Sequence, residues 1–250
     1  MIINKVYHLA DLHIRNLQRH KEYRQVFRKF LKQVKEDKIE DSVIYIAGDI
    51  AHAKTEMSPE LVKEISWFLT ECAKLREVIL ITGNHDCNLN NQHRLDVLTP
   101  IIDNLQNPRI HYLRDTGVYN IHNLTFVVYS IMDNKENWPK GELVEGENTI
   151  CLFHGPVNKA QTDIGYTVSS NSFQVDMFDG FDMAMLGDIH KRQTFGEGYE
   201  HIAYAGSMIQ QNHGELLENH GYLLWDIPTR TFTEHHIHND YGFLTVDVVN

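Results

Sequence analysis

The sequence of 250 residues contains no apolar run long enough to cross a lipid bilayer. Residues 1–5 lead straight into a strand-like segment and lack the apolar core and cleavage site of a signal peptide. The three cysteines, Cys72, Cys87 and Cys151, are widely spaced and odd in number, so they favour free thiols in a reducing compartment over a disulfide framework. We therefore expect a soluble, cytoplasmic protein with no membrane contact.

Positive charge is scarce as well, because the sequence has 23 lysines and arginines and 34 acidic residues, which gives a formal net charge of −11. An acidic protein of this kind does not bind nucleic acid through its overall charge. If its substrate were DNA, metal ions, local basic patches or a partner would have to hold that DNA. The hydrophobic fraction of 42% is enough for one sizeable core, and we expect a single domain over residues 1–250.

Strand-like and helix-like segments alternate through about residue 105. Residues 6–10, 42–47 and 78–82 are short apolar runs, and between them apolar residues recur at helical spacing over 23–34. A second helix is expected to open at Ser58 and Pro59, which form a plausible cap and first-turn pair. This alternation is typical of βαβ units and of an α/β fold.

The second half of the sequence is richer in strands joined by turns. Strands are predicted at 109–113, 118–121, 124–130, 149–153, 182–186, 201–204, 221–226, 230–236 and 243–249. Such a half following βαβ units predicts two sheets packed together with helices outside. Residues 133–148 and 155–172 are the longest candidate loops, and loops of that length inside a compact domain are often functional.

Five small polar clusters share one position, directly after a strand-like run. They are Asp11-Leu12-His13, Gly48-Asp49-Ile50-Ala51-His52, Gly83-Asn84-His85-Asp86, His154-Gly155 and Gly187-Asp188-Ile189-His190. Strand ends of an α/β sheet converge on one rim, where such sheets bind ligands. Carboxylates, imidazoles and an amide are ligands for hard or borderline divalent cations, so the clusters indicate a metal site.

The spacing within these clusters suits that chemistry. In Asp11-x-His13, the two side chains of an extended segment would point to the same side and could grip one ion. A bridging carboxylate such as Asp49 could hold two cations at about 4 Å, the separation used for phosphoryl displacement. The competing interpretation is that these clusters are ordinary turns whose polar side chains only cap the backbone. The presence of five such clusters, each at the end of a predicted strand, argues against it.

The order of these motifs resembles that of the calcineurin-like metallophosphoesterases, over nearly the whole chain. Residues 9–13, 48–50, 82–86, 186–192 and 204–207 are similar to the nuclease subunit of the double-strand-break repair nuclease–ATPase complex, the SbcD-like branch of that superfamily. The resemblance implies a four-layer αββα sandwich of two mixed sheets flanked by helices. It also implies two divalent cations, with Mn²⁺ preferred and Mg²⁺ as the alternative.

The resemblance further implies a role for each polar residue. One ion would be held by Asp11, His13 and His190, the other by Asn84, His154 and Asp188, with Asp49 bridging them. His85 would act as the general acid at the scissile phosphate, oriented by Asp86 or by His52. The family usually has Gly-His-x-His at 187–190, so Asp188 is either a direct ligand or lies behind the ligands.

Basic residues cluster in sequence beside the motifs despite the acidic composition. The candidates for phosphate contact are Arg15, Arg19, Lys191 and Arg192. The spacing from Arg15 to Arg19 fits a solvated helix face equally well.

The leading functional hypothesis is a DNA nuclease of repair or recombination, acting as a 3′→5′ exonuclease and a single-strand endonuclease. The alternatives are a phosphoesterase for a small phosphodiester or phosphoprotein and a DNA-end-binding scaffold with little activity. The resemblance implies DNA, an SMC-like ATPase subunit of the SbcC type and a second copy of the chain as partners. In that family a capping region and an ATPase tether follow the catalytic domain, and we expect both to be absent from residues 1–250.

Overall fold

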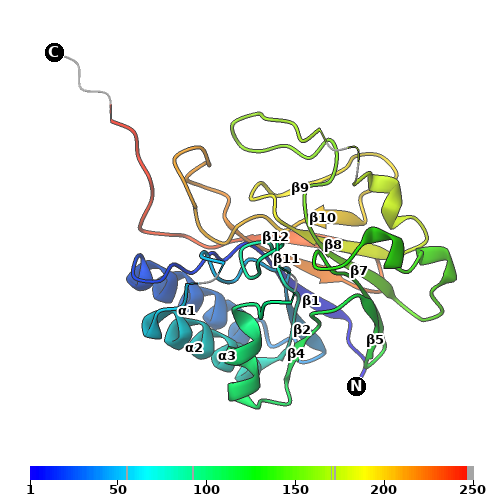
Figure 1. The fold of residues 1–250 in the computed structure, drawn as a ribbon, viewed down its shortest axis with the longest axis horizontal. Coiled ribbons are helices and arrows are strands. Elements are labelled where there is room, and N and C mark those ends of the chain that lie inside the picture. The colour runs from blue at the N-terminus through cyan, green and yellow to red at the C-terminus, as the bar shows by residue number, and fades with distance from the viewer. Residues whose placement is uncertain (55, 92, 170, 172, 247–250) are drawn as a thin grey trace.

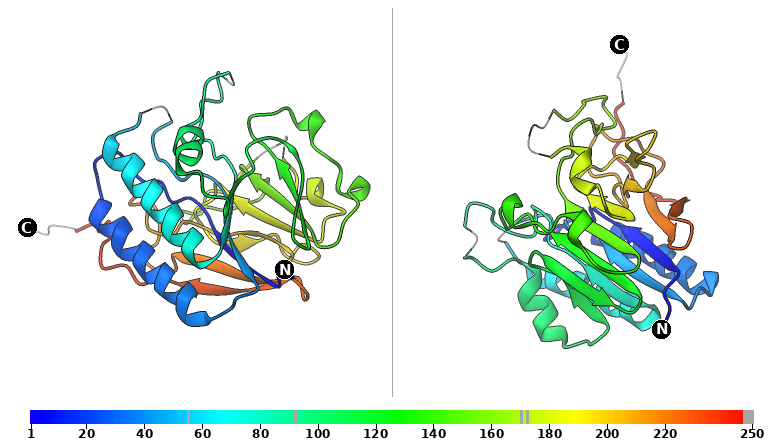
Figure 2. Two further views of the ribbon diagram at one scale, coloured as in Figure 1. Left: turned by 90° about the horizontal axis from the view of Figure 1, so that it is seen from below. Right: turned by 90° about the vertical axis from the view of Figure 1, so that its right-hand side faces the viewer.

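The computed structural model describes residues 1–54, 56–91, 93–169, 171 and 173–246. Two six-stranded sheets face each other, and helices cover the outer face of the first sheet (Figure 1). The two further views in Figure 2 show the helices on one side of the sheets and long loops on the other. The predicted two-sheet sandwich flanked by helices is confirmed.

The first sheet combines parallel and antiparallel strands in the order β12-β11-β1-β2-β3-β4. Its strands are β1 (Lys5–Leu9), β2 (Ser42–Ile46), β3 (Glu77–Leu80), β4 (Ile110–Tyr112), β11 (Gly221–Asp226) and β12 (Thr231–His236). Strands β1 to β4 run parallel, whereas β11 is antiparallel to both β1 and β12. The carboxyl ends of β1, β2 and β3 therefore lie at one edge.

The second sheet has the order β5-β6-β7-β8-β10-β9. Its strands are β5 (Gly117–Ile121), β6 (Leu124–Tyr129), β7 (Thr149–His154), β8 (Met183–Gly187), β9 (Gln193–Thr194) and β10 (Ile202–Tyr204). Strands β6, β7, β8 and β10 run parallel, and the edge strands β5 and β9 are antiparallel to their neighbours.

Three helices pack on the first sheet: α1 (His20–Asp37), α2 (Pro59–Leu75) and α3 (Leu98–Leu105). The predicted start of α2 is confirmed, since Oγ of Ser58 accepts a hydrogen bond from the backbone N of Leu61 at 3.1 Å. The rings of Phe27 and Phe68 stack at 4.1 Å between α1 and α2. Truncating either ring to alanine would cost about 3–5 kcal/mol, as is usual for a fully buried aromatic.

Three apolar cores separate the layers. Along β1, Tyr7 and Leu9 pack toward the helices while Val6 packs into the core between the sheets, as the two-residue period of a strand dictates. The third core covers the outer face of the second sheet, where Trp138 and Val144 pack against it. This outer layer contains three short 3₁₀ helices, η1 (Lys135–Asn137), η2 (Gly141–Leu143) and η3 (Val175–Phe178).

The strand predicted at 243–249 is wrong for the part of it that the structure describes. Residues 243–246 belong to no strand, and 247–249 lie outside the described residues. The backbone N of Phe243 donates to Oε1 of Gln210 at 2.7 Å. The aromatic ring of Phe243 lies 4.9 Å from the guanidinium of Arg19. Phe243 therefore packs against a loop and a side chain, whereas Leu244 and Val246 are largely exposed, so none of them has a sheet neighbour.

Candidate metal centre

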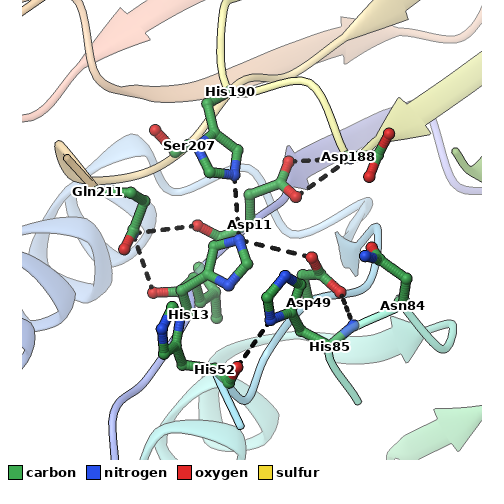
Figure 3. A network of polar contacts seen from close by, with 12 residues as sticks. Asp11, His13, Asp49, His52, Asn84, His85, Asp188, His190, Ser207 and Gln211 are labelled. Atoms are coloured by element: carbon green, nitrogen blue, oxygen red, sulfur yellow. Dashed lines mark hydrogen bonds and ion pairs between the residues drawn. The ribbon is translucent and has the colours of Figure 1, made fainter. Parts of the chain in front are cut away.

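All five predicted polar clusters meet at one edge of the two sheets, and Figure 3 labels residues from four of them. Three of them follow β1, β2 and β3, and the other two begin at the last residues of β7 and β8. Because these strands are parallel within each sheet, their carboxyl ends deliver the loops to a common rim. The clusters contribute seven potential ligands: Asp11, His13, Asp49, Asn84, His154, Asp188 and His190.

Asp49 lies between two groups of these side chains. Its Oδ2 is 3.5 Å from Nε2 of His13, and its Oδ1 is 3.4 Å from Nε2 of His154. The carboxylate is almost fully buried, with 2% of the residue exposed. This is the position that a bridging ligand requires.

On one side of Asp49, the Nε2 atoms of His13 and His190 lie only 3.0 Å apart. Ligand atoms of Asp11, His13 and His190 all lie within 4.8 Å of one another. Both carboxylate oxygens of Asp11 also accept from the backbone N of Asp188, at 3.1 and 3.2 Å. These residues make up the group predicted for the first ion.

On the other side, the side-chain amide of Asn84 lies 2.9 Å from Nε2 of His154. Oδ1 of Asp188 lies 3.8 Å from the same nitrogen. The side chain of Asp188 thus faces the predicted second site, within reach of the other donors, and it is mostly buried. Its φ of 101° is unusual for a residue other than glycine and turns the chain at this point.

The donor set fits divalent cations. Nδ1 of His154 lies 2.6 Å from the backbone O of Ala47, and Nδ1 of His190 lies 2.7 Å from Oε1 of Glu215. Since both partners are acceptors, each Nδ1 carries a proton and each Nε2 is the nitrogen that faces the centre.

The backbone beneath these ligands is not extended, contrary to the prediction for Asp11-x-His13. Asp11 and His13 have φ values of 52° and 46°, and Asp49 has 52°, all in the left-handed region. The backbone N of His13 donates to the O of Asp49 at 2.9 Å, which ties the two loops together. Tertiary contacts therefore hold a strained conformation that turns the ligands inward.

Two glycines make this arrangement possible. Gly48 has a φ of 81°, which other residues rarely adopt, and a Cβ there would lie 2.7 Å from Nδ1 of His154. At Gly83 a Cβ would collide with the backbone N and carboxylate of Asp49. Gly83 is required because two loops approach closely, rather than because the chain turns there.

The centre strongly favours positive charge. Burial alone would lower the pKa of His190, but Glu215 and Asp11 outweigh it and raise that pKa to about 9. Burial likewise opposes the charge on His154, and Asp49 and Asp11 raise its pKa well above the usual value. Burial raises the pKa of Asp11 to about 7. Buried carboxylates in this number need cations to balance them.

His85 lies beside the metal ligands with a defined orientation. Its Nδ1 is 2.7 Å from the backbone O of His52, and its backbone N donates to Oδ1 of Asp49 at 2.7 Å. The rings of His13 and His85 meet edge to face at 4.7 Å. Because Nδ1 is engaged by a carbonyl, Nε2 is the nitrogen available to a substrate.

Of the two residues predicted to orient His85, His52 contacts its ring nitrogen, through its backbone carbonyl. Asp86 is fully buried and instead accepts from the backbone N of Gly83 at 2.9 Å and of Ala51 at 2.8 Å. It therefore fixes the loops that carry the ligands and makes no contact with the ring of His85 among the described hydrogen bonds.

The four predicted phosphate contacts differ in their surroundings. Arg15 lines a hollow of about 230 Å³ together with His13 and His85, and Lys191 lines the neighbouring hollows. Arg19 is held by Glu22 at 2.7 Å and by the backbone O of Gln210 at 2.6 Å.

Arg192 is mostly buried and donates to Glu234 and to the backbone O of Ala205, both at 3.2 Å. The charges of Arg19 and Arg192 are thus already paired, whereas Arg15 and Lys191 line hollows that also contain metal-ligand candidates.

Two residues at the centre escaped the sequence prediction. Glu215 supports His190, and Gln211 approaches the backbone O of Leu12 with its Nε2 at 3.4 Å. Both lie in the loop between β10 and β11, beyond the 204–207 segment singled out in the sequence. No spacing signal marked them, because their role depends on the packing of this loop against residues far away in the chain.

Comparisons with known proteins agree with this geometry. The family profile described as calcineurin-like phosphoesterase matches residues 4–192. The uncharacterized protein R555 of Acanthamoeba polyphaga mimivirus is 42% identical over 261 residues. That match covers 99% of the chain but only 19% of the viral protein, so the chain spans about a fifth of that relative.

One solved structure resembles the chain in fold, and a second aligns more weakly. The crystal structure of TT1561 of Thermus thermophilus aligns with a TM-score of 0.55 and 8% identity, covering 94% of this chain and all of that one. A novel archaeal phosphodiesterase aligns with a TM-score of 0.48 and 12% identity, over 93% and 99% of the two chains. Separately, none of the helices in the described part of the chain is both long and apolar enough to span a membrane.

Proposed function

Because the chain belongs to the calcineurin-like phosphoesterase family, whose members are metal-dependent hydrolases, we propose that it is a DNA nuclease. It would hydrolyse phosphodiester bonds in DNA repair or recombination, as a 3′→5′ exonuclease and a single-strand endonuclease. The observation that carries the proposal is the position of Asp49 between two groups of converging nitrogen and oxygen atoms.

Two divalent cations would be held by the seven residues of the centre, with Asp49 between them. Mn²⁺ is the ion we favour and Mg²⁺ the alternative, since the donors are carboxylates, imidazoles and an amide without a thiolate. When bound, such ions supply Lewis-acid charge at the phosphoryl oxygens and lower the pKa of water. Glu215 and the backbone O of Ala47 hold His190 and His154 in the tautomer that such ions need.

His85 would supply the proton to the leaving oxygen. Its Nδ1 is fixed by the backbone O of His52, so Nε2 is the atom that can hold and release that proton. The centre of the His85 ring lies 4.7 Å from that of His13, so His85 lies beside the predicted metal ligands without being one of them. General acid assistance of this kind is typically worth about 10²–10⁴ in rate.

A polynucleotide substrate is favoured by the charge around the centre. The chain carries a net charge of −11, yet Arg15 and Lys191 lie at hollows that open on the ligands. These cations could hold phosphates on either side of a scissile bond. The sequence likeness to the SbcD-like nuclease subunit in residues 186–192 and 204–207 points to the same substrate.

The proposal extends to partners and compartment. By the same likeness we infer an SMC-like ATPase subunit and a second copy of the chain as partners, within a longer protein or complex. The cysteines Cys72, Cys87 and Cys151 are free and buried, which agrees with a reducing, intracellular compartment.

The proposal can be tested with two substrates side by side. A labelled single-stranded oligonucleotide and bis-p-nitrophenyl phosphate are incubated with Mn²⁺ or Mg²⁺, each with an EDTA control. We expect Mn²⁺-dependent cleavage of both, stopped by EDTA. Asp49→Asn should abolish cleavage, whereas Asp103→Asn, at an exposed carboxylate of α3, should leave it unchanged.

The outcomes separate the alternatives. Cleavage of bis-p-nitrophenyl phosphate with an intact oligonucleotide would indicate a phosphoesterase for small substrates. Tight binding of the oligonucleotide without cleavage of either substrate would indicate a DNA-end-binding scaffold. Either result would overturn the nuclease assignment.

A further inference from the structure

A second pocket, of about 470 Å³, opens directly beside the metal centre. Three of its lining residues, Asn84, His154 and Asp188, are also potential ligands of the second ion. The hollow that Arg15 lines shares only Asp188 with this pocket. The two hollows therefore flank the predicted metals, and a group attached to a phosphate at the centre could enter the larger one.

The far wall of this pocket is aromatic. Trp138, Phe153 and Phe173 line it together with Leu89 and Ile131. The ring of Trp138 meets that of Phe153 at 5.4 Å and 66°, and it lies parallel to Tyr129 at 4.7 Å. Its indole Nε1 donates to the backbone O of Ser130 at 3.3 Å, so the wall is held rigidly in place.

The rim of the pocket is polar. It is formed by residues 133–136, which include Asp133, Asn134, Lys135 and Glu136. This segment connects β6 and β7 and lies in the green region of Figure 2, on the side of the molecule away from α1 and α2. It supplies both hydrogen-bond donors and acceptors around an apolar, aromatic interior.

We propose that this aromatic pocket binds the base of the nucleotide next to the scissile phosphate, turned out of its stack. The inference rests on the proposed function, because it requires a nucleotide phosphodiester at the metal centre. A nucleobase is a flat apolar ring with a polar edge, which matches an aromatic wall under a polar rim. A pocket of this size and composition is typical of sites that enclose a small organic group.

The pocket would also select the form of the DNA. A base held inside the pocket can be neither stacked nor paired. A double-stranded substrate must therefore first lose the stacking and base pairing of that nucleotide. Single strands, frayed ends and mismatched termini release a base at low cost. The pocket therefore favours single-stranded or unpaired DNA over an intact duplex.

The test is a scan with abasic nucleotides. Single-stranded oligonucleotides carry one tetrahydrofuran abasic residue at successive positions around the cleavage site, and kcat/KM is measured for each with Mn²⁺. We expect a fall of about 5- to 100-fold when the abasic residue adjoins the scissile phosphate, in line with the loss of one stacked base. At positions further away, kcat/KM should stay close to that of the intact strand.

A matched pair of variants connects this effect to the pocket. Leu89 lines the pocket and is 41% exposed, whereas Leu95, in the same segment, is 66% exposed and does not line it. Leu89→Ser should raise KM for the intact oligonucleotide and reduce the abasic effect, and Leu95→Ser should change neither. Both side chains are exposed enough for the variants to fold, and Trp138→Ala serves as a stronger variant if it folds.

The results distinguish a failure of the base pocket from a failure of the proposed nuclease function. Efficient cleavage with equal kcat/KM at every abasic position would overturn the base pocket and leave the nuclease assignment standing. An oligonucleotide that stays intact while bis-p-nitrophenyl phosphate is cleaved would overturn both.

Discussion

Oε1 of Glu215 lies 2.7 Å from Nδ1 of His190, and this contact determines which nitrogen of His190 faces the metal centre. The carboxylate of Glu215 also accepts from the backbone N of Gln211 at 2.7 Å, which fixes its own position. A residue that touches no predicted ion thus orients one of the ligands.

Glu215→Gln should weaken metal binding while leaving the fold intact. An amide cannot hold the Nδ1 proton of His190 as a carboxylate does, so we expect a loss of about 10- to 100-fold in Mn²⁺ affinity. Isothermal titration with Mn²⁺ measures this directly. Glu218→Gln, at an exposed position of the same loop, is the control, and an equal loss there would argue against the assignment.

His85→Asn should reduce turnover and spare metal binding. The variant removes the proton that Nε2 would deliver, so kcat should fall by about 10²–10⁴. Mn²⁺ affinity should stay near the wild-type value, because His85 lies beside the ligand set rather than within it.

His52→Ala is the informative companion to His85→Asn. Because His52 orients His85 through its backbone carbonyl, the side-chain change should cost less activity than His85→Asn. If His85→Asn lost its metal instead of its turnover, His85 would be a ligand.

Asp86→Ala should affect stability rather than chemistry. The substitution leaves the buried backbone N–H groups of Gly83 and Ala51 without their acceptor, which costs about 1–3 kcal/mol of unfolding free energy. Urea unfolding measures that loss, and kcat is compared at a temperature where both proteins are folded. A large fall in kcat with unchanged stability would show a direct part in catalysis.

His8 should make the protein sensitive to acid. Burial lowers its pKa from the usual 6.5 to about 3, with Arg192 adding to the effect and a backbone hydrogen bond with Leu186 opposing it. Below pH 6.5 the unfolded chain therefore binds a proton that the folded chain does not. The contribution of His8 does not lower the free energy of unfolding above pH 6.5. Between pH 6.5 and pH 3 it lowers that free energy by about 1.4 kcal/mol per pH unit.

The variant His8→Gln isolates that contribution. Glutamine retains an acceptor for Nε1 of Trp225, which lies 3.3 Å from Nδ1 of His8, but it does not titrate. The unfolding free energy of both proteins is measured in urea between pH 7 and pH 4. The unfolding free energy of the wild type should fall more steeply with decreasing pH, by the slope that corresponds to up to one additional bound proton in the unfolded state. Parallel curves for the two proteins would contradict the assignment.

Features governed by neighbouring residues were predictable. The start of α2 at Ser58 and Pro59 depends on one side chain and one amide three residues apart, so the sequence was sufficient. The strand predicted at 243–249 failed because apolar alternation does not say what the segment packs against. There the contacts with Gln210 and Arg19 prevail over strand propensity.

The sequence by itself determined the identity of the polar side chains at the centre, because each follows a strand whose own residues mark its end. It also determined the layered fold, since the order of strands and helices admits few arrangements. Only the tertiary structure decided how those side chains are used. The left-handed backbone at Asp11 and His13, the support of His190 by Glu215 and the pairing of Arg19 with Glu22 all depend on how distant loops pack. Such contacts carry no local signature, because distances between remote segments are set by the packing of the whole sandwich.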